Sequence, residues 1–135
     1  MNEIAVRRND YEPIDKPHLI KLSLVFTKEE YQKLIRGHIP YQMEDKWYIF
    51  YEDDWLYFHR SWTGYGMYKA QVLPDQNGYY IDEFWAERRK EMNKYGDDYN
   101  DSWEFLMLVS YYLLGINTRV YLQEQNQRQN KIILE

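Results

Sequence analysis

Residues 46–60 read KWYIFYEDDWLYFHR, two runs of aromatic and apolar residues on either side of an acidic tripeptide. The runs, 46–51 and 55–60, have the length and the aromatic content of β-strands. Their connection, Glu52-Asp53-Asp54, is short and polar, as the turns of β-hairpins are. We therefore expect a hairpin over 46–60.

The second run separates its side chains into two sets, because successive side chains of a strand point to opposite faces. We expect Leu56 and Phe58 to face the core. Arg60 then emerges on the same face, at the core edge where the strand ends, and His59 points the other way.

The hairpin is expected to be part of a larger meander. The pattern predicts a third strand over 66–73, followed by the turn signal Asn77-Gly78 and a short strand over 79–81. Upstream, residues 19–26 alternate as a half-buried strand does. The sequence predicts an α+β fold in which an antiparallel β-meander of about four or five strands packs against two or three helices.

Three helices are expected. The first begins with the capping box Thr27–Glu30 and ends at Gly37. The second is expected over 83–95, with Asp82 as its cap. The third, over 102–114, is apolar nearly all round and is therefore expected to be buried.

The 135 residues suit a single domain, whose folded core is expected over 19–116. Residues 1–18 are predicted to be an arm leading into that core. Residues 117–135 turn polar and are predicted to be a C-terminal extension, either a solvated helix or a frayed tail.

Charge and composition limit the possible partners and locations. A net charge of −5 argues against duplex nucleic acid as a partner. The chain has no cysteine, which excludes disulfides and thiolate sites. The first ten residues have no apolar region typical of a secretory signal, and the longest apolar run is too short to cross a membrane. We expect a cytoplasmic protein without a membrane partner.

The candidate binding site is the sequence HRSWTGY, which combines a strand-end arginine with hydroxyls and aromatic rings. A guanidinium fork suits phosphate, and aromatic rings offer faces for stacking. Alternatively, the arginine stacks on Trp62 or binds a backbone carbonyl, and the turn is a structural corner. The candidate ligand-binding residues are His59, Arg60, Ser61, Trp62, Thr63, Gly64, Tyr65 and Arg88.

Arg88 is included because it falls in the middle of the apolar stripe of the helix expected over 83–95. If Arg88 faces Arg60 across a cleft, the two like charges need an anion between them. Otherwise Arg88 stacks on an aromatic ring or extends its charge to solvent.

The sequence contains no established catalytic or metal-binding motif. The three histidines lack the spacing of metal ligands, so neither a metal nor another cofactor is expected. Nothing identifies a nucleophile. The aspartates either hold a divalent ion and act as acid and base, or they only start turns and helices; they are Asp53, Asp54, Asp97, Asp98 and Asp101.

The run from Asp45 to Gly64, and above all His59–Gly64 (HRSWTG), resembles a small uncharacterised bacterial domain. That domain occurs alone and beside macro domains, which bind ADP-ribose. The resemblance extends over about 45–115. Trp85 and Arg88 match its Trp-x-Asn-Arg-Asp sequence, whereas Glu87 and Arg89 depart from it. The resemblance implies a link to ADP-ribose or NAD metabolism and to phage-defence signalling by such nucleotides.

Together these patterns favour a binding module for a phosphate-bearing, nucleotide-like ligand of the ADP-ribose or NAD-derived class. One alternative is a hydrolase that acts on such a ligand through Asp97, Asp98 or Asp101. The other is a protein-interaction domain whose aromatic surface meets a protein partner, including a second copy of the chain as a homodimer.

Overall fold

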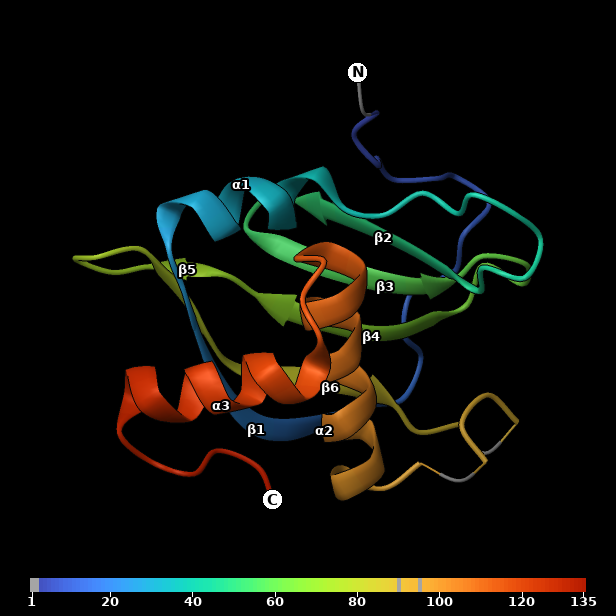
Figure 1. Cartoon of the computed structure of the whole chain (residues 1–135). Coiled ribbons are helices and arrows are strands. Elements are labelled where there is room, and N and C mark those ends of the chain that lie inside the picture. The colour runs from blue at the N-terminus through green and yellow to red at the C-terminus, as the bar shows by residue number, and fades with distance from the viewer. Residues whose placement is uncertain (1–2, 90, 95) are drawn as a thin grey trace.

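The computed structural model describes residues 3–89, 91–94 and 96–135. Its centre is an antiparallel sheet in the order β1-β6-β4-β3-β2, with β5 paired to β6 (Figure 1). The strands are β1 (Pro17–Phe26), β2 (Trp47–Glu52), β3 (Trp55–Arg60), β4 (Gly66–Gln71), β5 (Leu73–Pro74) and β6 (Tyr79–Glu87). The helices are α1 (Lys28–Arg36), α2 (Asp98–Met107), the π-helix η1 (Leu108–Leu113) and α3 (Thr118–Gln129). The predicted α+β fold with an antiparallel meander is confirmed.

The predicted hairpin is strands β2 and β3, which pair from Trp47 opposite Arg60 to Glu52 opposite Trp55. Asp53 and Asp54 connect them with φ angles of +50° and +75°. Two consecutive residues with positive φ make the type I′ turn, whose twist matches that of the paired strands. The acidic connection is therefore a two-residue turn.

The strand expected over 66–73 divides into β4 and β5, with the buried Val72 between them. β5 pairs with β6 through Leu73 opposite Tyr80. The turn between β5 and β6 forms where Asn77-Gly78 predicts it, because the Asp75 carboxylate accepts hydrogen bonds from both backbone N–H groups, at 2.9 and 2.8 Å.

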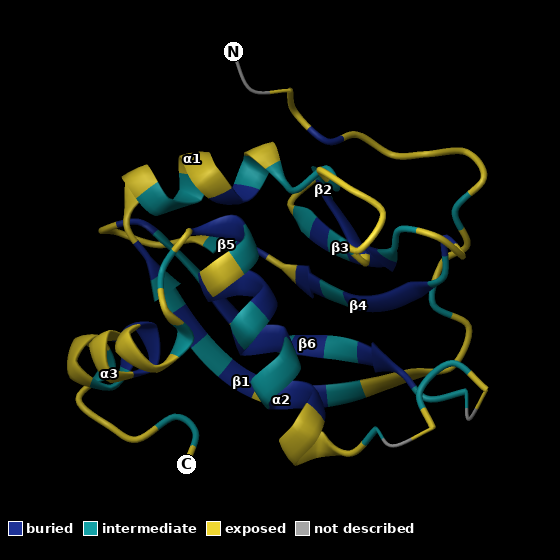
Figure 2. Ribbon diagram, turned by 45° about the vertical axis from the view of Figure 1, so that its right-hand side comes forward, coloured by how far each residue is buried: buried dark blue, intermediate teal, exposed yellow. Residues whose placement is uncertain are grey.

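Two helix predictions are confirmed. Thr27 and Glu30 form the reciprocal capping box at the start of α1. The predicted apolar helix is α2 continued by η1. It begins one turn earlier than expected, because the Asp97 side chain caps it by accepting a hydrogen bond from Asn100 N at 2.7 Å. Most of its apolar residues are buried (Figure 2).

The core between sheet and helices is centred on Phe105 of α2. Its ring stacks on that of Phe84 with the centroids 4.1 Å apart. It meets the rings of Phe58 and Tyr68 edge-on, at 5.2 and 6.2 Å. One helix residue thus contacts three strands, β3, β4 and β6, which fixes α2 across the sheet.

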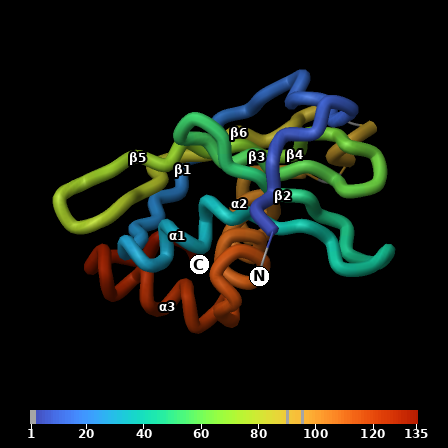
Figure 3. Tube along the Cα trace, turned by 90° about the horizontal axis from the view of Figure 1, so that it is seen from above, coloured from blue at the N-terminus to red at the C-terminus, as the bar shows by residue number. Residues whose placement is uncertain are grey.

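The predicted arm covers the opposite face of the hairpin. In Figure 3 the helices lie along one side of the sheet and the arm continues to the other side. Ala5 is buried there with Tyr48 and Phe50 of β2, and the Tyr48 hydroxyl donates to the Val6 carbonyl at 2.8 Å. The folded part of the chain therefore begins well before residue 19.

A buried carboxylate fixes the end of the arm. Glu87, at the end of β6, is fully buried and accepts hydrogen bonds from the backbone N–H groups of Asp15, Lys16 and Arg89 at 2.7, 3.0 and 3.1 Å. Burial by itself opposes the charge, but these three bonds and the Arg89 guanidinium hold the pKa of Glu87 below its ordinary value.

The helix predicted over 83–95 is wrong: β6 continues through Glu87 and pairs along its length with β1. The pairing shifts register between Lys21 and Leu24. The buried residues of β6 on either side of this shift, Ile81 and Phe84, are three positions apart, which is also the spacing of a helix face. Pairing with β1 and β4 on both edges overrides that local signal.

The polar C-terminal extension contains α3, which is part of the fold. Tyr121 and Leu122 are buried in the main core. Gln125, also buried, donates to the Val25 carbonyl at 2.7 Å and accepts from Val25 N at 2.9 Å. Its side-chain amide thus pairs with the backbone of edge strand β1 as a neighbouring strand would.

Within the described residues, no single helix is long and apolar enough to cross a membrane; the helical stretches Asp98–Leu113 and Thr118–Gln129 reach that length and composition only together, and they are bent by 102°.

We predict that Glu87→Gln destabilises the protein in a pH-dependent way. Because the pKa of Glu87 is lower in the folded than in the unfolded chain, its stabilisation is complete above the unfolded pKa of about 4.3 and is lost as the pH falls through the folded pKa. Urea denaturation should show the variant less stable by about 1–3 kcal/mol near pH 6. The difference should shrink towards pH 2.5.

The matched control is Glu83→Gln on the same strand, where the carboxylate pairs with the exposed Lys21. This variant should lose much less stability than Glu87→Gln at any pH, because exposed ion pairs contribute little. A Glu87→Gln difference that stays constant with pH would contradict the role given to the charge.

Candidate functional site

The backbone of the turn between β3 and β4, residues 61–65, is fixed by hydrogen bonds within the turn and by a hydrogen bond from the arm. Gly64 N donates to the Arg60 carbonyl at 2.8 Å, and Arg60 N donates to the Tyr65 carbonyl at 2.9 Å. The Gly64 carbonyl accepts from Glu12 N at 2.9 Å. Gly64 has φ +77°, and a Cβ there would lie 2.6 Å from the ring of Tyr11. A glycine is therefore required at this position.

His59 supports the turn from beneath and is not exposed to a ligand. Its ring is buried, stacks on Tyr11 and Phe50 at 5.3 and 5.5 Å, and has Nδ1 2.9 Å from the Gly64 carbonyl. Burial lowers the pKa of His59. The imidazole is therefore neutral, and Nδ1 carries the proton, since a carbonyl oxygen can only accept.

Ser61 and Trp62 fasten the turn to the loop that precedes β2. The Ser61 hydroxyl donates to the Asp45 carbonyl at 2.8 Å, and the Trp62 indole N–H donates to the Met43 carbonyl at 2.8 Å. Turn and loop therefore lie side by side, and Trp62 remains 69% exposed.

The turn, the loop and the segment after β6 enclose a surface hollow of about 780 Å³, which we call the main hollow. This volume is in the range of small-molecule sites, about 300–1,000 Å³. Its wall combines sulfur-containing and aromatic side chains with two cations and two carboxylates. The lining residues are Met43, Glu44, Lys46, Arg60, Trp62, Thr63, Tyr65, Met67, Glu91 and Met92.

Arg60 reaches the main hollow from the core edge, as its strand position predicts. It lies opposite Trp47 in the hairpin, and its guanidinium stands 4.6 Å from the centroid of the Trp47 ring. Within the described part of the chain, its guanidinium has no carboxylate partner and donates no hydrogen bond. The ring therefore orients the cation without neutralising it.

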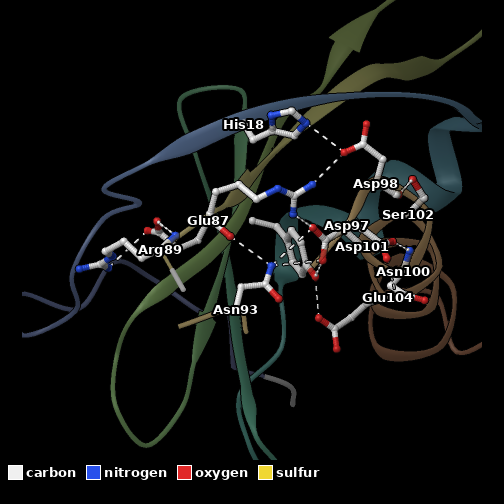
Figure 4. A network of polar contacts seen from close by, with 12 residues as sticks. His18, Glu87, Arg89, Asn93, Asp97, Asp98, Asn100, Asp101, Ser102 and Glu104 are labelled. Carbon is white, nitrogen blue, oxygen red and sulfur yellow. Dashed lines mark hydrogen bonds and ion pairs between the residues drawn. The ribbon is translucent and has the colours of Figure 1, made fainter. Parts of the chain in front are cut away.

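The structure places Arg88 elsewhere. Arg88 follows β6 and forms ion pairs with Asp98, at 2.8 Å, and with the buried Asp101 of α2. Figure 4 shows the surrounding network, in which Asp101 also accepts from Asn93 and from the Tyr68 hydroxyl. Arg88 is not among the described residues that line the main hollow.

The aspartates of the hydrolase alternative have structural partners. Asp97 caps α2, and Asp98 and Asp101 pair with Arg88; Asp98 also lies 3.0 Å from His18 Nε2. Among the described residues, no three His, Cys, Asp or Glu side chains are grouped so as to hold a metal ion. Asp53 and Asp54 make the hairpin turn.

Apart from Arg88, the predicted site residues thus divide into two groups. Arg60, Trp62, Thr63 and Tyr65 line the main hollow, whereas His59, Ser61 and Gly64 hold the turn in shape. Sequence reasoning missed the rest of the lining, namely Met43, Glu44, Lys46, Met67, Glu91 and Met92. All six lie outside the strand and turn 55–65, in the loop before β2, on β4 or after β6, so no signal within that stretch marks them.

No protein-family model, no curated protein and no solved structure matches the chain.

We predict that Gly64→Ala destabilises the protein more than Gly115→Ala. Both glycines have positive φ, +77° and +71°, and an alanine in that conformation costs about 1–2 kcal/mol. At Gly115 the added methyl meets nothing within 4 Å, whereas at Gly64 it meets Tyr11. Urea denaturation should show the larger loss for Gly64→Ala, and equal losses would mean that Tyr11 does not hold the turn.

Proposed function

We propose that this protein is a binding module for a phosphate-bearing, nucleotide-like small molecule held in the main hollow. In this proposal Arg60 and Lys46 bind the phosphate, and Trp62 stacks on the planar group. The ADP-ribose or NAD-derived class is the one that the resemblance of His59–Gly64 implies, and a role in defence signalling by such nucleotides would follow from it.

The observation that carries the proposal is the unpaired charge of Arg60. Four other arginines, Arg7, Arg88, Arg89 and Arg128, form ion pairs with carboxylates at 3.3 Å or less, and Arg8 lies 3.9 Å from Asp10. Apart from Arg60, the two remaining arginines, Arg36 and Arg119, form no ion pair among the described residues, but both are exposed. Arg60 also forms none with the described residues, although it is half-buried and faces a hollow that also has Lys46 on its wall. A guanidinium in such a position suits a phosphate group, which it can bind through two parallel N–H donors.

The aromatic and sulfur-containing wall supports a planar group next to the anion. Trp62 is largely exposed and its N–H is engaged by Met43, so that it offers a ring face rather than a donor. Tyr65 is less available, because the Arg89 guanidinium stands 5.6 Å from its ring centroid. Methionines adapt their shape to a ligand and contact aromatic rings favourably.

The carboxylates of the main hollow favour a ligand that also carries hydroxyl or amino groups. Glu44 and Glu91 line it, and neither has an ion-pair or hydrogen-bond partner among the described side chains. Carboxylates accept hydrogen bonds from sugar hydroxyls or from an exocyclic amine. A nucleotide supplies both kinds of group, whereas inorganic phosphate supplies neither.

One observation favours a second candidate, the docking of a protein partner. Tyr41, Met43 and Trp62 are 92%, 71% and 69% exposed, and such side chains are typical of protein interfaces. A partner of this kind would need the apolar side chains but not the unpaired charge of Arg60. The two candidates therefore differ in what Arg60 contributes.

We predict that Arg60→Ala weakens the binding of ADP-ribose by about 10- to 150-fold. A hydrogen bond to a charged group contributes about 1.5–3 kcal/mol, and every 1.4 kcal/mol is about tenfold in affinity. Lys46→Ala should also weaken binding, though less, because an exposed ammonium is a mobile point charge. Isothermal titration calorimetry on wild type and variants measures this.

The matched control is Arg119→Ala, which removes another guanidinium that lies over a tryptophan, 5.7 Å from the ring centroid of Trp103, outside the main hollow. It should leave the dissociation constant unchanged. Failure of wild type to bind ADP-ribose, ADP or AMP at millimolar concentration would overturn the proposal, and so would unchanged binding by Arg60→Ala.

A further inference from the structure

A second hollow lies next to the main one and shares a wall with it. Its volume is about 480 Å³, and Met43, Trp62 and Thr63 line both hollows. Its remaining wall comes from the arm, through Arg8 and Tyr11, and from the loop before β2, through Tyr41. Trp62 therefore stands between two spaces that are each large enough for a nucleoside-sized group.

The second hollow repeats the chemistry of the main one. The Arg8 guanidinium lies 5.3 and 5.4 Å from the ring centroids of Tyr11 and Tyr48, much as Arg60 lies over Trp47. Tyr41 stands almost fully in solvent and offers a further ring face. Each hollow thus combines a cation that lies over aromatic rings with an exposed aromatic side chain.

The carboxylates of the second hollow leave the Arg8 charge largely available. Asp10 is 3.9 Å from the Arg8 guanidinium, and both side chains are exposed, at 77% and 51%. Exposed pairs of this kind contribute little to binding energy. Asp45 is engaged by His38, whose Nε2 lies 2.6 Å from its carboxylate.

From this arrangement we infer that the ligand has two lobes on either side of Trp62, joined by phosphates that pass the edge of its ring between Arg60 and Arg8. One lobe occupies the main hollow beside Arg60, and the other occupies the second hollow beside Arg8 and Tyr41. The chemical class is a dinucleotide or a nucleoside diphosphate sugar, in which two sugar or base groups flank a pyrophosphate. This inference rests on the proposed function, because it assumes that the main hollow binds a phosphate-bearing ligand.

A single-lobed ligand would leave the second hollow unused. AMP carries one base, one ribose and one phosphate, and these can be accommodated in the main hollow alone. ADP-ribose adds a second phosphate and a second ribose. The difference in affinity between the two therefore reports on the second hollow, while binding of AMP reports on the main hollow.

The test compares AMP and ADP-ribose on the wild-type protein, Arg8→Ala and Tyr41→Ala by isothermal titration calorimetry. Wild type should bind ADP-ribose at least about tenfold more tightly than AMP, since one further charge-assisted contact contributes about 1.5–3 kcal/mol. Each variant should lose most of that advantage and bind AMP as wild type does. Their melting temperatures check that the fold is intact.

Arg7→Ala is the matched control, because Arg7 is the neighbouring arginine of the arm, pairs with Glu52, and does not line the second hollow. It should keep the full advantage of ADP-ribose. If AMP and ADP-ribose bind wild type equally, or if Arg8→Ala weakens the binding of both alike, the inference of a two-lobed ligand is overturned and the proposed function stands. If neither binds, both are overturned.

Discussion

Strand β3 is covered on both faces, by the helices on one side and by the arm on the other, and this fixes the face to which each of its side chains points. On one face Leu56 and Phe58 pack under the helices, and on the other His59 packs under the arm. A strand held in this way cannot shift its register by one residue without exchanging the two faces. Arg60 must therefore emerge on the helix face, over Trp47, and the turn that follows must begin where it does.

Polar side chains then hold the arm and the segment after β6. Glu87 fixes the end of the arm through three backbone N–H groups. Asn93 donates to Asp101 at 3.3 Å and to the Glu87 carbonyl at 3.1 Å, which holds the segment that carries Glu91 and Met92. Because unpaired buried polar groups are costly, these contacts favour one arrangement of the wall over others.

The network at Asp101 also explains why Arg88, which we expected to bind the ligand, instead stabilises the fold. Arg88 compensates the buried carboxylate of Asp101, whose other partners are Tyr68 and Asn93. Burial and the neighbouring carboxylates of Glu104 and Asp101 raise the pKa of Tyr68, so its hydroxyl stays protonated as a donor. Removing Arg88 would leave a buried charge uncompensated, which is a structural cost.

Local signals in the sequence were sufficient to predict most of the fold. The two-residue turn at Asp53-Asp54, the capping box at Thr27 and the all-apolar helix around Phe105 each depend on neighbours in sequence. The strand direction of Arg60 followed from simple alternation. These features are encoded within about ten residues, and such patterns are readable without a structure.

The rest depends on contacts between residues far apart in the chain. The spacing of Ile81 and Phe84 also suits a helix face, and only the pairing of β6 with β1 on one side and β4 on the other shows that it is a strand. The stacking of Tyr11 on His59 has no signal in either local sequence. The same holds for Met43 and Glu91, which meet at the main hollow only because two separate loops are held there.

The most direct test of the account is to follow the indole N–H signals of the five tryptophans by NMR during titration with ADP-ribose. Trp62 lines the main hollow and Trp47 lies beneath Arg60, whereas Trp55, Trp85 and Trp103 do not line it. We expect the signals of Trp62 and Trp47 to shift in a saturable way while the other three stay in place. Shifts confined to Trp55, Trp85 or Trp103, or no shift at all, would contradict it.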